Sequence, residues 1–212
     1  RHFARMTNTP VFEPADPRQA YEMFLEAARL SVELSMPVIL RMTTHVCHAK
    51  KLVHFSGRSR QSGKEKADRS PGFNPRPGEF IPLTSSVAAM KKKSILKLNK
   101  VREQAEISGF NMLIENSSDR GIITCGLPSL SLNDILSEIT APPDVLILGM
   151  PWPLPEELIA DFCGRHKDVL ILEELDPLIE KDVKALAFDR KIAVNITGKT
   201  EPDDFIGELT PR

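Results

Sequence analysis

A chain of 212 residues can form one large domain, or one domain and a piece of another. Hydrophobic residues make up 41% of it and charged residues 27%, which is an ordinary balance for a globular protein with a packed core. The formal net charge of −1 gives no reason to expect nucleic acid as a partner of the whole surface. No apolar run is long enough to cross a membrane.

The three cysteines are far apart and form no C-x-x-C pair. Cys47, Cys125 and Cys163 therefore indicate a reducing compartment, and they argue against a disulfide framework or an iron–sulfur cluster built within this chain. The chain opens without an initiator methionine and without a charged-then-apolar leader. We therefore expect an excised fragment of a cytoplasmic protein.

The first predicted helix begins near Asp16. Asp16 is a good N-cap, Pro17 suits the first helical position, and Gln19 stands where a capping box places a glutamine. Apolar residues at helical spacing predict one buried face, made of Tyr21, Phe24, Leu25, Ala28 and Val32. Pro37 ends this helix, and residues 37–43 are predicted to form a buried strand.

Residues 56–83 show no periodicity and are rich in basic residues, Ser, Gly and Pro, so we predict an exposed connector. A second helix is predicted over 87–107, with Ile95, Leu98 and Val101 in its apolar stripe. The opposite face of this helix carries Lys91, Lys92, Lys93, Lys97 and Lys100. These lysines could contact an acidic partner such as a ferredoxin, or nucleic acid, but a run of lysines on a helix is more commonly a solvated face.

After Gly109, strand and helix patterns alternate. Residues 110–115 and 121–125 flank a turn-rich segment that favours a hairpin. Continuously apolar strands, typical of strands covered on both faces, are predicted at 145–148, 169–172 and 192–196. Helices are predicted at 130–139, 155–163 and 177–187. Before the last of these, Asp176-Pro177 repeats the pattern of Asp16-Pro17, an N-cap aspartate followed by a proline at the first helical position. The fold class is therefore α/β, with a mostly parallel sheet and helices on both faces.

A metal site is one interpretation of His45, Cys47, His48 and His54, which follow the first predicted strand. Their spacing matches no standard zinc pattern, so a loop with solvated histidines is favoured.

Glu173 and Glu174 end a predicted strand, at the edge where open parallel sheets place ligands. Two carboxylates could act as acid and base, but adjacent strand residues point to opposite faces. We expect instead that one carboxylate accepts backbone N–H groups near the next helix start. Gly126 is a single glycine between a strand and a helix, so a turn that requires backbone freedom is favoured over a phosphate loop.

Several segments together resemble the large subunit of indolepyruvate ferredoxin oxidoreductases, in the same order along the chain. They are Arg1–Arg5 leading to Val11–Pro17, Pro37–His48, Phe73–Leu83, Met150–Leu158, Leu172–Glu180 and Gly207–Pro211. Met42, His45 and Cys47 stand where the family usually has threonine, arginine and serine, and the turn at Leu127–Leu130 is also atypical. These departures are consistent with a paralogue that acts on another 2-oxoacid.

The resemblance implies a division into three parts. Residues 1–50 would be the tail of a pyrimidine-binding α/β domain, residues 51–90 an extended linker, and residues 91–212 a domain similar to the transketolase C-terminal domain. It implies oxidative decarboxylation of an aryl 2-oxoacid to an acyl-CoA, with electrons passing to ferredoxin. Thiamine diphosphate, Mg²⁺ and [4Fe-4S] clusters would be held outside this segment, with CoA as co-substrate. The expected partners are the other domains, the small subunit and ferredoxin, in a homo- or hetero-oligomer.

No catalytic residue is carried over from the family. The substrate-binding candidates are Arg41, Thr43, Thr44, His45 and His48, because they follow a strand whose carboxyl end should face the cofactor cleft. Arg41 could pair with a substrate carboxylate or form a structural ion pair, and the sequence leaves both open.

Two rivals stand beside a segment of a thiamine-dependent enzyme. The first is a non-catalytic scaffold or interaction module derived from such an enzyme. The second is a small nucleotide-binding α/β protein.

Overall fold

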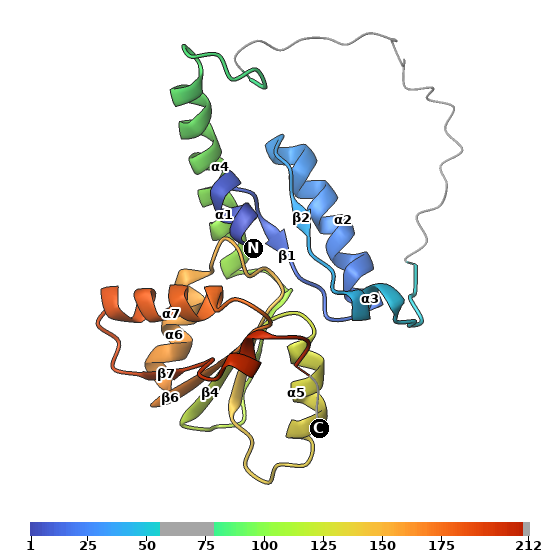
Figure 1. Cartoon of the computed structure of the whole chain (residues 1–212), viewed down its shortest axis with the longest axis vertical. Coiled ribbons are helices and arrows are strands. Elements are labelled where there is room, and N and C mark those ends of the chain that lie inside the picture. Colours follow the sequence, from blue (N-terminus) through green and yellow to red (C-terminus); the bar gives the residue numbers. More distant parts are fainter. Residues whose placement is uncertain (56–78, 210–212) are drawn as a thin grey trace.

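A computed structural model describes residues 1–55 and 79–209 of the chain, so most of the predicted connector, residues 56–78, lies outside the described residues. The first part contains two short strands and three helices (Figure 1). These are α1 (His2–Thr7), β1 (Val11–Phe12), α2 (Pro17–Leu34), β2 (Ile39–Leu40) and α3 (Thr44–His48).

The second part begins with the long helix α4 (Val87–Glu106) and continues as a sheet with flanking helices. Its remaining elements are β3 (Asn111–Ile114), β4 (Arg120–Thr124), α5 (Pro128–Leu136), β5 (Asp144–Leu148), α6 (Glu156–Arg165), β6 (Asp168–Leu172), α7 (Leu178–Asp189), β7 (Asn195–Thr197) and the 3-10 turn η1 (Pro202–Phe205).

The five-stranded sheet has the order β3-β5-β4-β6-β7, and every neighbouring pair except β3–β5 is parallel. Helices α6 and α7 cover one face, where Phe162 and Ile159 pack against Ile123 and Leu146. Helix α5 covers the other face, where Leu132 packs against Ile122. The predicted α/β class, with a mostly parallel sheet and helices on both faces, is confirmed.

The predicted hairpin between residues 110–115 and 121–125 is wrong. Strand β3 pairs antiparallel with β5, from Asn111 opposite Leu148 to Ile114 opposite Val145, and β4 lies on the other side of β5. The turn-rich segment is used differently, since Asp144 Oδ1 at the start of β5 accepts the backbone N–H groups of Asn116 (2.7 Å) and Ser118 (3.2 Å). The segment therefore wraps around the start of β5.

Burial differs between the strands that share an apolar sequence. Every residue of β5 is buried, and so is β4 after Arg120. In β6 buried residues alternate with accessible ones, and Leu170 is 36% exposed, so the expected cover on both faces is wrong for β6. Strand β3 at the edge of the sheet exposes Met112, Leu113 and Ile114.

Strand β7 begins at Asn195, later than the predicted start at Ile192. The reason is the end of α7, where Lys191 adopts a left-handed conformation and Ile192 donates its N–H to the Ala187 carbonyl. Ile192, the first residue of the predicted strand, therefore takes part in the capping hydrogen bonds at the C-terminus of α7.

Helix α2 is capped as predicted, because Asp16 accepts the N–H of Gln19 at 2.9 Å. Its predicted apolar face is wrong. The buried residues are Met23, Ala27 and Leu30, whereas Val32 is 81% exposed and Phe24 57%. Helix α2 thus has two apolar stripes. The one that is buried contains the flexible Met23 and the small Ala27, which fit against neighbouring helices more easily than the larger side chains of the predicted stripe.

A second core joins the first part of the chain to the second. Phe12, Met23 and Leu30 pack against Val101 and Ala105 from α4, together with Met150 after β5. The predicted stripe of α4 is correct for Leu98 and Val101, but Ile95 is 45% exposed. The predicted buried strand over 37–43 is reduced to β2, which pairs in parallel with β1 and is only half buried. The division into residues 1–50, 51–90 and 91–212 stays a prediction.

None of the helices in the described ranges 1–55 and 79–209 has the length and apolar character needed to span a membrane.

Candidate functional site

A cluster of buried and half-buried charged side chains lies at the carboxyl end of β4 and β6, beside the residues before and after β1. We define the charge cluster as Arg1, Glu13, Arg41, Glu173 and Glu174. Arg1 is its centre, since its Nε and Nη2 donate to the two oxygens of Glu13 at 2.6 and 2.7 Å, and its Nη1 donates to Glu173 at 2.6 Å. The cluster thus joins distant parts of the chain, since the hydrogen-bonded Arg1 and Glu173 are 172 positions apart in the sequence.

Glu13 is placed by the strand before it. Its N–H donates to the Gly149 carbonyl at 2.9 Å, and its side chain is 1% exposed. Arg41, placed by β2, donates to the second oxygen of Glu13 at 3.2 Å. Burial works to raise the pKa of Glu13, but the hydrogen bonds and charge of Arg1, with the charge of Arg41, outweigh burial and hold that pKa below its usual value. Glu13 is therefore an ionised, fully paired carboxylate.

Glu173 caps the start of α7. Its two oxygens accept the N–H groups of Ile179 (3.1 Å) and Glu180 (2.8 Å), which confirms that one carboxylate of this pair serves the next helix. Asp176 is not the N-cap that the Asp-Pro pattern predicted, since that position is Pro177 and the Asp176 carboxylate contacts His2 at 3.0 Å. Leu175 takes a left-handed conformation that reverses the chain, and this lets the earlier residue Glu173 reach the helix start.

Glu174 differs from its neighbour because one of its oxygens has no hydrogen-bond partner among the described residues. The residue is 5% exposed, and Oε1 is fully buried. Burial raises the pKa of Glu174, and the nearby carboxylate of Glu208 adds to the effect, while the charge of Arg41 opposes it. The two adjacent carboxylates therefore have separate environments, and they do not act as a pair on one atom.

Cys125 and Gly126 complete the floor of the charge cluster. The buried Cys125 thiol lies 3.0 Å from Arg1 Nη2, and burial raises its pKa, so it is a neutral packing residue. Gly126 has a φ of +60°, and a Cβ there would stand 3.4 Å from a Glu13 oxygen. Its carbonyl accepts the Ser129 hydroxyl at 2.7 Å. The prediction of a strand-to-helix turn that requires backbone freedom is confirmed.

The predicted substrate-binding residues separate into two groups. Arg41 belongs to the charge cluster, where it pairs with Glu13, and its pairing with a substrate carboxylate stays a prediction. Thr43 caps α3 by accepting the Val46 N–H at 3.4 Å, and His45 Nδ1 lies 3.9 Å from Glu208. Thr44 and His48 are exposed on α3. The candidates after Arg41 thus lie in or just before α3, where Thr44, His45 and His48 are exposed.

The cysteines and histidines do not converge. Cys47 is exposed on α3, while Cys125 and Cys163 are buried in the sheet body. Among residues 1–55 and 79–209, no group of three His, Cys, Asp or Glu side chains is arranged to hold a metal ion. The three cysteines therefore lie apart from one another in the described residues.

Sequence reasoning missed Arg1 and Glu13 as partners, because their role depends on a contact between distant segments. It also missed the buried pair of His166 and Asp144, whose Nε2 and Oδ2 lie 3.0 Å apart. For Glu13 the sequence did contain an indication, because this acidic residue directly follows the apolar residues Val11 and Phe12. If that segment is buried, the charge of Glu13 must be paired.

Comparisons with curated proteins match almost the whole chain. The indolepyruvate oxidoreductase subunit IorA of Methanothermobacter marburgensis is 32% identical over 204 residues, which cover 95% of this chain and 32% of that protein. Over almost its whole length the chain is similar to part of an indolepyruvate oxidoreductase subunit. The IorA subunits of Thermococcus kodakarensis and Pyrococcus abyssi are 33% and 34% identical, over 94% of this chain and 31% of theirs. The predicted resemblance is confirmed, and the chain spans about one third of the length of these IorA relatives.

A solved structure supports the fold of this IorA homologue. The 2-oxoglutarate:ferredoxin oxidoreductase from Magnetococcus marinus superposes with a TM-score of 0.62 at 15% identity, covering 91% of this chain and 39% of that one. No protein-family model matches the sequence.

Proposed function

We propose that the chain is part of the large subunit of a 2-oxoacid:ferredoxin oxidoreductase that converts an indolepyruvate-like substrate into an acyl-CoA. The observation that carries this proposal is the 32% identity to an indolepyruvate oxidoreductase subunit over 95% of the chain. The electrons would pass to ferredoxin, and the small subunit would be a partner in a homo- or hetero-oligomer. The cytoplasmic location expected from the sequence belongs to the same proposal.

In this proposal the segment serves mainly structure and assembly. The charge cluster supports that role, because Arg1, Arg41 and the α7 N–H groups occupy the carboxylates of Glu13 and Glu173. Thiamine diphosphate, Mg²⁺ and the [4Fe-4S] clusters would be held by other parts of the full-length protein and would supply carbanion and electron-transfer chemistry there. CoA would enter as co-substrate.

The test uses the full-length large subunit, co-expressed with its small subunit under anaerobic conditions. We expect CoA-dependent reduction of ferredoxin with indolepyruvate, at a kcat/KM at least about tenfold above that with 2-oxoglutarate. An inactive complex that still holds its clusters and thiamine diphosphate would contradict the proposal and favour the scaffold alternative.

The surface of α3 is proposed to lie near the substrate. Thr44, His45 and His48 are exposed, while Arg41 and Thr43 position the start of α3. The variant His45→Ala/His48→Ala in the full complex should raise KM several-fold with little change in kcat, which is the result of losing uniform binding. Lys50→Ala, also exposed and just beyond α3, is the matched control. An unchanged KM in the double variant would remove α3 from the substrate site.

A further inference from the structure

The N-terminal half of α4 buries no residue and contacts the described residues mainly through polar side chains, such as the Asn8 amide that donates to the Ser94 hydroxyl at 3.3 Å. None of residues 87–97 is buried, and the buried residues of α4 are Leu98, Val101 and Ala105 in its second half. In Figure 1 the first turns of this helix extend beyond the rest of the second part. Isolated helical segments of this length are marginal in water, because most helical stability in proteins comes from a packed face. This half of α4 is therefore a surface that another element is expected to contact.

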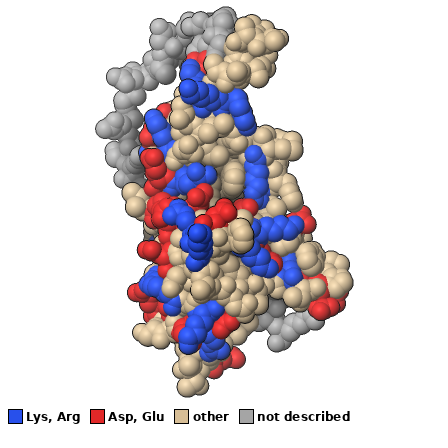
Figure 2. Space-filling view, turned by 90° about the vertical axis from the view of Figure 1, so that its left-hand side faces the viewer, with Lys and Arg blue, Asp and Glu red and all other residues tan. Residues whose placement is uncertain are grey.

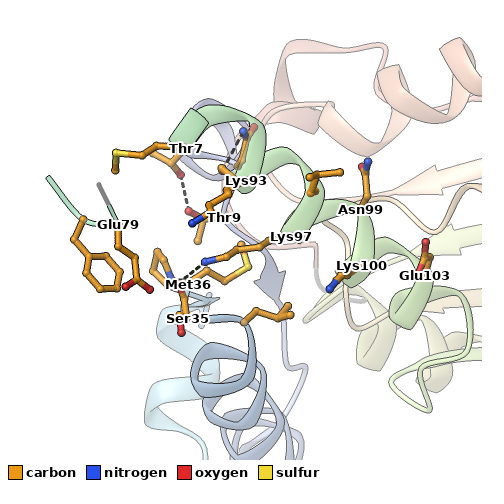
Figure 3. A pocket seen from close by; sticks show the side chains of 17 residues that line it. Thr7, Thr9, Ser35, Met36, Glu79, Lys93, Lys97, Asn99, Lys100 and Glu103 are labelled. Carbon is orange, nitrogen blue, oxygen red and sulfur yellow. Dashed lines mark hydrogen bonds between the residues drawn. The ribbon is translucent and has the colours of Figure 1, made fainter. Parts of the chain in front are cut away.

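A groove of about 820 Å³ runs along α4 from Met90 to Glu103. It is bounded by the end of α1, the end of α2, residues 79 and 80, and α4 itself (Figure 3). Its apolar lining includes Leu34, Met36, Met90 and Leu96, and Leu96 is 53% exposed. An apolar groove of this size has room for several side chains of a polypeptide.

Three lysines line the groove at positions 93, 97 and 100, the i, i+4 and i+7 spacing of one helix face. Lys97 serves the fold, since its Nζ donates to the Ser35 carbonyl at the end of α2 at 2.9 Å (Figure 3). Lys93 and Lys100 are exposed, and within residues 1–55 and 79–209 neither forms an ion pair. Figure 2 shows lysine and arginine side chains gathered over α4 in the upper part of the molecule. Glu79 and Glu103 also line the groove, so the lining carries three lysines and two glutamates, and its positive charge lies along the α4 face.

We propose that this groove receives an acidic amphipathic segment from the rest of the large subunit. This proposal rests on the chain being part of a longer subunit, as its coverage of 32% of the IorA relative indicates. The apolar lining requires apolar side chains, and Lys93 and Lys100 at the rim require carboxylates beside them. A hydrated inorganic anion would use the lysines and leave Met90 and Leu96 exposed. Rim charges of this kind set orientation and association rate more than affinity.

The experiment uses the full-length large subunit in complex with its small subunit, treated with a zero-length carbodiimide that couples lysine amines to contacting carboxylates. Peptide mass spectrometry should find Lys93 or Lys100 joined to an Asp or Glu that lies in the large subunit outside these 212 residues. The measurement needs no turnover, so its outcome is separate from the substrate test. No cross-link from either lysine, or cross-links to the small subunit alone, would overturn the proposal.

Two variants and a control sharpen the result. Lys93→Glu/Lys100→Glu should remove the cross-links and increase proteolytic cleavage of the docked segment about tenfold, because two attractions become repulsions. Leu96→Asp should increase cleavage similarly through the apolar lining. Lys50→Glu/Lys181→Glu changes two exposed lysines away from the groove and should leave cleavage unchanged. Equal cleavage in the control, or full protection of Lys93 and Lys100 by inorganic pyrophosphate alone, would contradict a docked polypeptide.

Discussion

The five-stranded sheet and the segment of residues 1–55 are held by different interactions. In the sheet, β5 is buried at every residue and packs between α5 on one side and α6 and α7 on the other. The N-terminal segment contributes two-residue strands and an apolar contact with α4, and Arg1 and Glu13 join it to Glu173 at the end of β6 through the charge cluster. Apolar burial tolerates many residue choices, whereas a buried ion cluster depends on each member. The comparison predicts that single polar substitutions will affect the N-terminal segment more than the sheet.

The largest expected effect is that of Glu13→Gln. This change leaves the buried Arg1 with one carboxylate partner instead of two, and breaking a buried pair costs about 3–5 kcal/mol. Urea denaturation followed by circular dichroism should show the free energy of unfolding lowered by about 3 kcal/mol. Glu22→Gln, which alters the exposed pair of Arg18 and Glu22, is the control and should change stability by less than about 1 kcal/mol. Equal effects would mean that the charge cluster does not anchor the segment.

A pair of substitutions in α2 tests which stripe of this helix is packed. Met23→Ala removes a side chain that is 1% exposed and should cost about 2–4 kcal/mol in the free energy of unfolding. Val32→Ala, at an 81% exposed position, should change it by less than about 0.5 kcal/mol. If Val32→Ala lowered the free energy of unfolding more than Met23→Ala did, the packed face of α2 would be the one predicted from the sequence. That face is made of Tyr21, Phe24, Leu25, Ala28 and Val32.

Gly149→Ala tests the junction between the two regions. A Cβ at Gly149 would stand 2.5 Å from the Phe110 carbonyl oxygen and 2.7 Å from the end of the Met23 side chain. Because the first of these neighbours is backbone just before β3, β3 and β5 must move apart, and the Met23 side chain of α2 must give way, at a cost of about 1–3 kcal/mol. Gly164→Ala, where a Cβ meets nothing within 4 Å, is the matched control. If Gly149→Ala left the free energy of unfolding unchanged, the N-terminal segment and the sheet would be less closely packed at this junction than the structure indicates.

The smallest expected effect concerns pH. The pKa of Glu174 is raised in the folded protein, so the folded state holds its proton more tightly than the unfolded state. Glu174 therefore lowers stability as pH rises from its unfolded pKa through its folded pKa. Glu174→Gln should stabilise the protein by about 1 kcal/mol at pH 8 and have little effect at pH 4. A stabilisation that is equal at both pH values would show that ionisation of Glu174 is not its cause.

The sequence predicted those elements whose formation depends on local rules. The helix starting after Asp16 follows from its cap and proline, and strands β5 and β6 follow from apolar runs. The prediction that a carboxylate of Glu173-Glu174 serves the next helix was also correct.

The errors arose where local patterns allow two outcomes. The segment after Ile114 has the composition of a hairpin turn, but Asp144 binds its N–H groups, and the antiparallel partner of β3 became β5. Helix α2 has two apolar stripes, and only the position of α4 and Met150 decides which one is buried. Of the candidate site, Arg41 was singled out, but its partner Glu13 depends on the pairing of β1 with β2, which no local rule specifies.

Strand β3 has a consequence for handling the protein. Its outer edge has no strand partner among the described residues, and Met112, Leu113 and Ile114 are 36–40% exposed there. Unpaired main-chain groups beside apolar side chains are a template for adding a strand from another molecule. We therefore expect this chain, when purified alone, to self-associate with rising concentration, and Leu113→Lys to keep it monomeric.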